Sequence, residues 1–525
     1  MRLKRLRSER GFTMAPVAIA ASFISIVVVV SATAVQGDLH LTRNDLDHKQ
    51  SYEAARAGLA DYAFHLNKDT NYWTRCTSVP APSAVNQIGS TTNRRPVPGA
   101  SGASYALELV PRTGQTACST SDPVGTMLEQ SGPSTGTFRI RSTGYAGEEQ
   151  QSIVATFKRA SFLDYLYFTQ LETSDPVTYG NAATIAGAYQ QCTKTIAEGR
   201  WNAPIPGSGG QFCDIIVFPN WDDINGPLHT NDALVTCGSP DFGRTSSDVI
   251  EVSSPPQGWY RYSGCTGNPD FIGTFVTNAP VLTPPPTNSK LATIAQSGGV
   301  FYTGQRGIVL NSDGTMTVRT NMSQPGTTVS LPSNGVLYVA NGACSSSYSP
   351  YTATYPNTSG CGNVRIRGTY SGQLTIAAEN DIIIDGDLTR TGNGMLGLIA
   401  NNFVRVYRPY PTQTSRSNCG SGSGSSGLEN LSIHAALLAI QHSFIVDHYN
   451  CQATTGDGDL ETLTVNGAIG QKFRGAVGTF SGSTLVSGYQ KNYNYDDRLR
   501  YVSPPHFLDP VESAWHIQRQ TLDYP

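Results

Sequence analysis

The sequence predicts an α+β N-terminal module, made of a long hydrophobic helix and an antiparallel meander, followed by a large, mainly β domain that is parallel β-helix-like. Three observations predict this. Residues 12–37 contain no charged side chain, apolar residues then recur at helical spacing, and short β-branched runs separated by Gly, Asn, Asp and Pro fill the chain after Ser161. At 525 residues the chain is long enough for two folded parts.

A basic leader precedes the uncharged stretch. Residues 1–11 hold Arg2, Lys4, Arg5, Arg7 and Arg10 against the single acid Glu9. As a helix, residues 12–37 would be about 39 Å long, which exceeds the roughly 30 Å hydrocarbon core of a bilayer. The positive-inside rule then places Met1 in the cytoplasm and the chain after Asp38 outside. We therefore expect a transmembrane helix over 12–37, although a secretory signal peptide is an alternative.

The region from 38 to 159 combines a helix with alternating strands. Tyr52, Ala55, Leu59, Tyr62 and Leu66 follow one another at spacings of 3, 4, 3 and 4, which predicts one apolar helix face. Further along, apolar and polar residues alternate in three segments, as they do in strands with one buried face. The apolar members are Tyr105, Leu107 and Leu109, then Phe138 and Ile140, then Ile153, Ala155 and Phe157. A helix packed on an antiparallel meander is expected.

Residues 160–525 are predicted to form the β-rich domain. Short apolar runs recur at 336–339, 364–366, 374–376, 382–384, 396–399 and 404–406. Such runs between turn residues indicate stacked strands, β-helix-like from about 335 to 480, with a β-sandwich as the alternative. Near the end, Asp509, Pro510 and Glu512 fit an N-cap, a first-turn proline and a capping-box acid. They predict a capping helix over about 510–521.

All ten cysteines lie after the uncharged stretch, on the side that would be exported. An even count without any Cys-x-x-Cys favours structural disulfides in an oxidising compartment over a metal site. The sequence alone leaves the connectivity open. Nearest-neighbour pairing would join Cys76 with Cys118, Cys192 with Cys213, Cys237 with Cys265, Cys344 with Cys361, and Cys419 with Cys451.

The segment RGFTM, from Arg10 to Met14, joins the basic leader directly to the uncharged run. Here the chain resembles a type IV prepilin. The resemblance implies that a prepilin peptidase cleaves between Gly11 and Phe12 and methylates Phe12. Thr13 and Pro16 then fall in the segment that pilins use for assembly, and Pro16 replaces the acid that the family has at the fifth mature position.

Two other parts of the chain also resemble known groups of proteins. Residues 51–157, with the stretch AARAGLADYAFHL, look like the N-terminal region of pilus-assembly minor pilins. The stretches GPLHTND, from Gly226 to Asp232, and IAAENDIIIDGDL, from Ile376 to Leu388, look like an uncharacterised domain of bacterial pilin-like surface proteins. That second likeness implies no catalytic set.

Several polar residues are candidates for chemistry. Asp381, Asp385 and Asp387 would suit paired acid and base work on a polysaccharide, but aspartates between strands usually bond the local backbone. His229 would suit a general base, yet no nucleophile or acid stands at an interpretable spacing from it. Asp457, Asp459 and Glu461 are weak calcium candidates, because a complete ligand loop is missing. We predict no catalytic residues, no resident metal and no cofactor.

Charge and composition limit the possible partners. Charged residues make up 14% of the chain and its formal net charge is -3, so no basic surface for nucleic acid is expected. The resemblance implies a minor pilin or pseudopilin that presents its β domain at a filament tip or on the cell surface. Its partners would be other pilins, the assembly machinery, the prepilin peptidase and the inner membrane, which it would cross once. The alternatives are a surface adhesin that binds a glycan or protein, and a membrane-tethered polysaccharide hydrolase or lyase.

Overall fold

The computed structural model describes residues 14–69, 72–76, 94–129, 136–159, 161–179, 182–344, 360–408, 428–451, 459–481, 484–500, 502–511 and 515–523. The chain forms two compact units. The smaller unit comprises Met1–Gln130, Gly136–Lys158 and Ala514–Pro525, and the larger comprises Ser131–Thr135 and Arg159–Ser513. Most of the larger unit is therefore inserted, in sequence, between two pieces of the smaller one.

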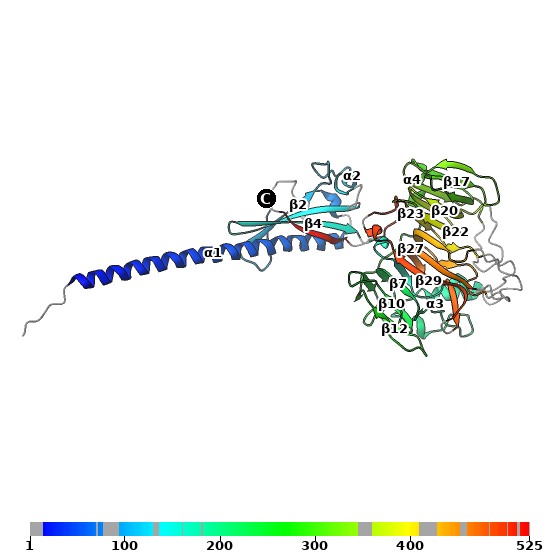
Figure 1. Ribbon diagram of the computed structural model, residues 1–525, viewed down its shortest axis with the longest axis horizontal. Helices are drawn as coiled ribbons and strands as arrows, with labels where there is room; N and C mark the ends of the chain where they lie inside the picture. The colour runs from blue at the N-terminus through cyan, green and yellow to red at the C-terminus, as the bar shows by residue number, and fades with distance from the viewer. Residues whose placement is uncertain are drawn as a thin grey trace, which may run out of the picture. The chain divides into compact units, whose positions relative to one another are not determined.

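The smaller unit is one long helix packed on a five-stranded sheet (Figure 1). The sheet has the order β1-β2-β3-β4-β30, and the pairs from β1 to β4 are antiparallel. Its elements are α1 (Met14–Lys68), η1 (Tyr72–Arg75), β1 (Arg95–Pro96), β2 (Ala103–Val110), α2 (Pro123–Met127), β3 (Thr137–Ala146), β4 (Glu149–Arg159) and β30 (Trp515–Asp523).

Helix α1 meets the sheet through its apolar face. Leu59, Tyr62 and Leu66 are buried together with Phe138 and Ile140 of β3 in one core. Period-3.6 spacing on the helix and period-2 spacing on the strand bring these side chains to facing surfaces. The approach is close, because a Cβ atom at Gly144 would collide with the carbonyl oxygen of Ser51.

The predicted fold class is wrong. Over the described residues the structure is mostly β, and its long helix is not the hydrophobic helix on which the predicted module was to be built. Within the described residues, no helix is both long and apolar enough to cross a membrane. The described side chains of α1 from Arg43 to Lys68 include charged residues along its length, so that this stretch is amphipathic.

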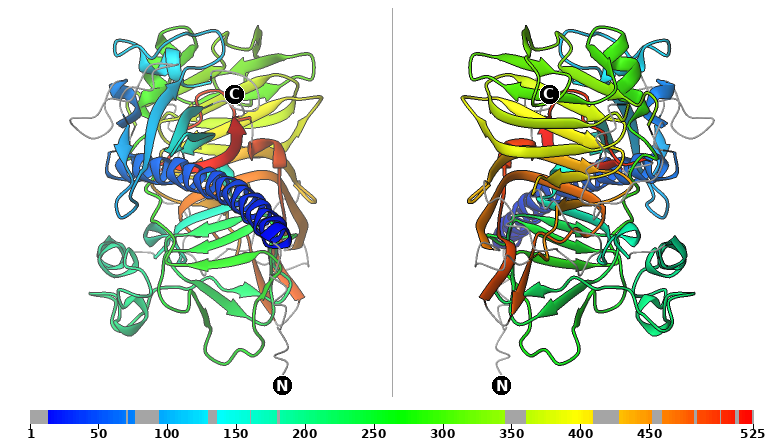
Figure 2. Two further views of the ribbon diagram at one scale, coloured as in Figure 1. Left: turned by 90° about the vertical axis from the view of Figure 1, so that its left-hand side faces the viewer. Right: turned by 90° about the vertical axis from the view of Figure 1, so that its right-hand side faces the viewer.

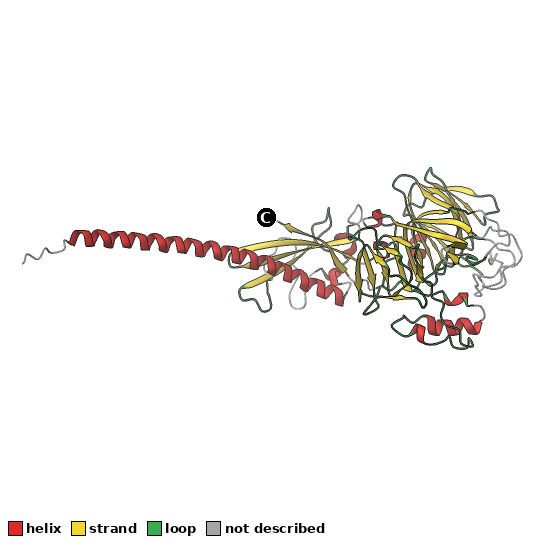
Figure 3. Ribbon diagram, turned by 60° about the horizontal axis from the view of Figure 1, so that its bottom comes forward, coloured by secondary structure: helices red, strands yellow, loops and turns green. Residues whose placement is uncertain are grey.

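Strands dominate the larger unit, as the yellow arrows of Figure 3 show. Its helices are η3 (Phe162–Asp164), η4 (Pro176–Thr178), α3 (Ala182–Cys192), η5 (Arg200–Asn202), α4 (Ser289–Gln296) and η6 (Asp497–Arg500). Its strands in the first half are β5 (Tyr167–Leu171), β6 (Phe218–Pro219), β7 (Asp223–Asn225), β8 (Leu228–Thr230), β9 (Leu234–Cys237), β10 (Asp241–Phe242), β11 (Val249–Val252), β12 (Trp259–Arg261), β13 (Asp270–Phe271), β14 (Thr274–Thr277), β15 (Val300–Thr303), β16 (Arg306–Leu310) and β17 (Thr315–Arg319). The remaining strands are β18 (Thr327–Ser330), β19 (Val336–Ala340), β20 (Val364–Tyr370), β21 (Gln373–Ala378), β22 (Ile382–Arg390), β23 (Met395–Ala400), β24 (Val404–Val406), β25 (Ser432–Ala439), β26 (Phe444–Val446), β27 (Asp459–Phe473), β28 (Gly478–Ser481) and β29 (Thr484–Tyr495).

One continuous parallel ladder organises this unit. It runs in the order β15, β19, β21, β23, β25, β27, β5, β8, β11, β14, and Figure 2 shows the strands stacked one above another. The first strand of the unit, β5, therefore lies in the middle of the ladder, between β27 and β8. Strands β5, β8, β11 and β14 come first in the chain and form one end of the ladder. The chain then continues with β15 at the other end, and β27 pairs with β5.

The ladder holds apolar residues in register. A column of side chains runs from Leu337 through Ile376, Leu398, Leu437, Ile469, Tyr167 and Leu228 to Ile250. All of these residues are buried in the same hydrophobic core. In parallel sheets covered on both faces, strands read as apolar runs rather than alternations, which matches the β-branched runs of the sequence.

A second parallel ladder, β16-β20-β22-β24-β26, lies beside the first. Its column Ile308, Ile366, Ile384, Val406 and Val446 is fully buried.

The predicted capping helix over about 510–521 is wrong, because Trp515–Asp523 forms strand β30 of the small sheet. Pairing in the sheet and burial of Trp515 outweigh the local helix-start signal of Asp509, Pro510 and Glu512.

Candidate functional site

The residues predicted to direct processing lie at the start of the chain. Gly11, Phe12 and Thr13 are outside the described residues. Pro16 lies in the first turn of α1, where a proline, which lacks a backbone N–H, is tolerated because first-turn N–H groups have no partner within the helix. The structure therefore leaves the predicted cleavage site as a prediction.

Four predicted disulfides are confirmed. Cys76 bonds Cys118, Cys192 bonds Cys213, Cys237 bonds Cys265, and Cys344 bonds Cys361. Cys451 is also disulfide-bonded, and its expected partner Cys419 lies outside the described residues. Each of the four closes a short loop, which restricts the unfolded chain and so stabilises the folded one.

The three aspartates of the candidate catalytic group are separated by their partners. Asp381 accepts a hydrogen bond from the Phe403 backbone N–H at 3.0 Å, and its other oxygen lies 3.4 Å from Arg405. Asp385 pairs with Arg365 Nε at 2.5 Å and is buried, which raises its pKa. The exposed Asp387 accepts from the Ser432 backbone N–H at 2.9 Å. Asp381 and Asp385 thus pair with different arginines, and Asp387 bonds the backbone.

His229, in β8, is fully buried and has a partner at each ring nitrogen. Its Nδ1 lies 2.9 Å from Glu251 Oε2, and its Nε2 lies 3.0 Å from Asn231 Oδ1. Glu251 is the residue directly opposite in the adjacent parallel strand β11, and Tyr165 also donates to it at 2.7 Å. No local sequence pattern connects this acid with His229, because it lies 22 residues away in the chain. The histidine is held inside the stack by these contacts.

The calcium candidates are only partly described. Asp457 lies outside the described residues, while Asp459 Oδ1 accepts from the backbone N–H of Glu461 at 2.7 Å. Glu461 in turn accepts from the Asn430 side chain. Over the described ranges, no group of three or more His, Cys, Asp or Glu side chains is arranged to hold a metal ion.

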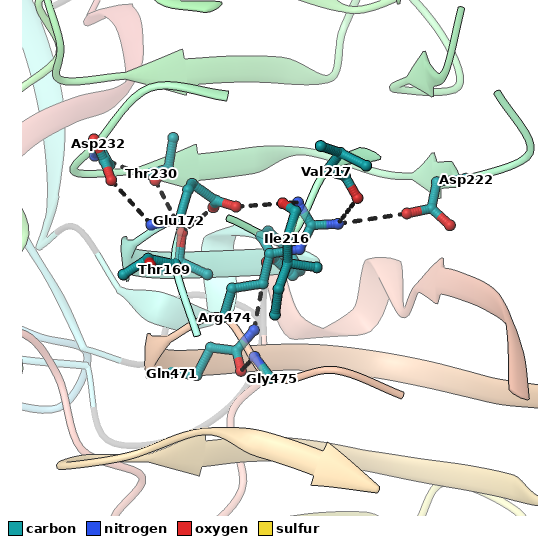
Figure 4. A network of polar contacts seen from close by, with 12 residues as sticks. Thr169, Glu172, Ile216, Val217, Asp222, Thr230, Asp232, Gln471, Arg474 and Gly475 are labelled. Atoms are coloured by element: carbon teal, nitrogen blue, oxygen red, sulfur yellow. Dashed lines mark hydrogen bonds and ion pairs between the residues drawn. The ribbon is translucent and has the colours of Figure 1, made fainter. Parts of the chain in front are cut away.

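A buried charge network that no local sequence pattern indicates surrounds Arg474 (Figure 4). Arg474 lies between two carboxylates, with Nη1 3.2 Å from Glu172 and Nη2 3.4 Å from Asp222. The same guanidinium donates to the backbone oxygens of Ile216 and Val217 at 3.0 and 3.1 Å. Burial raises the pKa of Glu172, and the positive charge of Arg474 opposes that shift.

The network extends through further ion pairs. Lys491 pairs with Asp222, and burial lowers the pKa of this lysine. Arg200 pairs with Asp232, which also accepts the backbone N–H of Glu172 at 3.0 Å. Removing one partner of such a buried ion pair is costly, because it leaves an uncompensated charge in the core. No local sequence pattern indicates these residues, since they come from distant parts of the chain: Glu172 and Arg474 directly follow β5 and β27, and Lys491 lies in β29.

Comparison with solved structures finds a similarity to a pilin. The crystal structure of the competence-associated pilin ComZ from Thermus thermophilus matches with a TM-score of 0.33 and 12% identity, over 92% of this chain and 99% of that one. At this TM-score the likeness establishes neither the fold nor the function of this chain. No family model matches the sequence, and no curated protein is similar to it.

Proposed function

We propose that this chain is a minor subunit of a bacterial type IV pilus-like system, and that it presents its larger unit at a filament tip or on the cell surface. The observation that supports this most is the place of the insertion. The larger unit leaves the small sheet after β4 and the chain returns to the same sheet as β30, next to β4. A helix-and-sheet module thus has a β-rich insert whose two ends join neighbouring strands.

The small unit has its own core, as a subunit body needs. Leu59, Tyr62 and Leu66 of α1 pack in one buried core with two aromatic residues of the sheet. These are Phe138 of β3 and Trp515 of β30. Trp515 lies in β30, the strand that follows the insert, and it is part of this core. The insert is therefore connected to the small unit at both of its ends. Because the small unit and the insert have separate cores, the small unit can carry a large insert without a change in its own packing.

The N-terminal sequence supports entry into such a system. In this proposal Gly11 and Phe12 flank the cleavage site, and the protein remains at the inner membrane or passes to the surface with other pilins. Pro16 provides no carboxylate at the fifth mature position. We therefore place the subunit at the end of a filament, where no further subunit has to be aligned above it.

Mass spectrometry of the mature N-terminus tests the proposal. The protein should be purified from cells with and without a prepilin peptidase. We expect a chain that begins at N-methylated Phe12 in the first case and an uncut chain in the second. The same uncut N-terminus in both strains, or a cut at another residue, would contradict the proposal.

A further inference from the structure

A pocket of about 470 Å³ lies on the larger unit and is lined by aromatic and polar side chains. Trp201 of η5, Phe212 and Tyr262 contribute the aromatic surface, and Gln211 and Asp214 contribute the polar groups. We call it the aromatic pocket. Its size falls within the range of small-ligand sites, about 300 to 1,000 Å³.

Two of the three aromatic residues are exposed. Phe212 is 51% and Tyr262 is 45% accessible to solvent. Trp201 is half-buried and packs edge-on against Tyr260, with 5.2 Å between ring centroids. A single exposed aromatic residue needs no explanation, but three that share one concave surface leave apolar area that a ligand would cover.

Disulfides hold the two walls of the aromatic pocket. Cys213, which follows Phe212, is bonded to Cys192 at the end of α3. On the other wall, the backbone N–H of Cys265, which is bonded to Cys237, donates to the carbonyl of Tyr262 at 3.1 Å. A wall that is already ordered loses less conformational entropy when a ligand binds.

The polar groups suit a ligand rich in hydroxyls. Gln211 is exposed and has both a donor and an acceptor, and Asp214 has a carboxylate acceptor. The backbone of Asp214 is fixed, because its carbonyl accepts from Ser174 N–H at 2.9 Å and from the Thr173 hydroxyl at 2.7 Å. We propose that the aromatic pocket binds an uncharged carbohydrate, with a sugar ring stacked on the aromatic faces and its hydroxyls bonded to Gln211 and Asp214.

The charge of the aromatic pocket favours an uncharged sugar over an anionic polymer. Its lining cation, Arg200, is fully buried and already paired with Asp232. Single-stranded nucleic acid requires a positively charged groove beside its stacking residues, and acidic glycans require an available cation. The remaining lining charge, on Asp214, is negative.

This inference goes beyond the proposed function and stands independently of it. The residues of the aromatic pocket all belong to the larger unit. A chain that fails to enter a filament would still bind the sugar, and a filament subunit without this binding would leave the proposed function intact.

The full chain in detergent should be applied to an array of neutral, N-acetylated and acidic oligosaccharides. Affinity for the glycans that bind should then be measured by titration calorimetry, with cellotetraose and chitotetraose as defined soluble probes. We expect binding to uncharged glycans, and we expect Tyr262→Ala and Phe212→Ala each to weaken it by about tenfold. Tyr262→Phe should retain the affinity, because the stacking face remains.

Phe64→Ala is the matched control, since Phe64 is a similarly exposed aromatic residue, 53% accessible, in the smaller unit. It should leave glycan binding unchanged. Far-UV circular dichroism of each variant confirms that the fold is kept, which we expect because the substituted side chains are exposed. The proposal is overturned if no uncharged glycan binds, if only acidic glycans bind, or if Tyr262→Ala and Phe212→Ala bind as well as the wild type.

Discussion

The indole ring of Trp515 meets the ring of Phe138 edge-on, with 4.7 Å between the centroids and an interplanar angle of 81°. Trp515 also contacts Trp73 at 5.9 Å. Trp515, which lies near the C-terminus in sequence, thus belongs to the same core as residues of α1. The same strand is fixed a second time, by a hydrogen bond of 2.6 Å from Arg141 to Asp523.

Trp515→Ala should destabilise the small unit. Trp515 is 3% exposed, and its removal leaves a cavity beside Phe138 and Trp73. We expect the free energy of unfolding to fall by about 3 to 5 kcal/mol, as for other buried Trp or Phe truncations. Urea denaturation measures this, and Leu522→Ala in the same strand, at a residue 44% exposed, is the control. Equal stability of the two variants would show that β30 is not part of the core.

The buried charge network predicts that a variant lacking one charge of a pair is less stable than the variant lacking both. Arg474→Met removes the partner of Glu172 and should cost about 3 to 5 kcal/mol, because a carboxylate is left in the core without compensation. The double variant with Glu172→Gln should recover part of that loss. Thermal or urea denaturation of both decides the point, and a double variant less stable than Arg474→Met alone would argue against a direct pairing.

His448 predicts a loss of stability in acid. Burial lowers the pKa of His448 from 6.5 to about 4, and its Nδ1 lies 2.6 Å from the carbonyl of Arg408. A pKa that is lower in the folded state means that the unfolded state binds the proton more tightly. The stabilisation is therefore complete above about pH 6.5 and is lost as the pH falls toward 4, by up to about 3 kcal/mol.

His448→Asn isolates this effect. The backbone φ of His448 is +53°, a conformation that asparagine tolerates. Denaturation curves of the wild type and the variant at a series of pH values should differ most in slope between pH 6.5 and 4. Parallel pH dependence in the two proteins would mean that other groups are responsible.

Ile384→Asp tests the packing of the second parallel ladder. Ile384 lies between Ile366 and Val406 in the register of β20, β22 and β24, and it is fully buried. An unpaired carboxylate there should cost several kcal/mol. Gln373→Asp, at an exposed position of β21, is the control and should change stability by less than about 0.5 kcal/mol. Wild-type thermal stability in Ile384→Asp would contradict the register.

Local patterns in the sequence predict some of these features and not others. The alternation at Tyr105, Leu107 and Leu109 identifies strand β2, although Ala106 and Glu108 on its other face are buried as well. Four disulfides join cysteines that are nearest neighbours in the sequence. Such pairing is predictable, since short loops close at low entropic cost. The strand alternation and the cysteine pairing both depend on residues that are close together in the chain.

The features that were missed or predicted wrongly depend on contacts between distant residues. Strand β30 carries a helix-start signal before it, and only pairing in the small sheet makes it a strand. Glu172 and Asp222, the partners of Arg474, adjoin strands β5 and β7, and Glu251, the partner of His229, lies in the neighbouring strand β11. All three acids lie far from their partners in the chain. The aromatic pocket likewise joins residues near 201, 212 and 262, which share no motif.

Immunogold labelling of sheared filaments, with an antibody against the larger unit, tests the central claim most directly. A strain that expresses Gly11→Ala, in which processing should fail, is the control. The account predicts gold at filament ends in the wild type and no label on filaments in the control strain. Dense, regular label along the shaft, or label that never accompanies filaments, would contradict it.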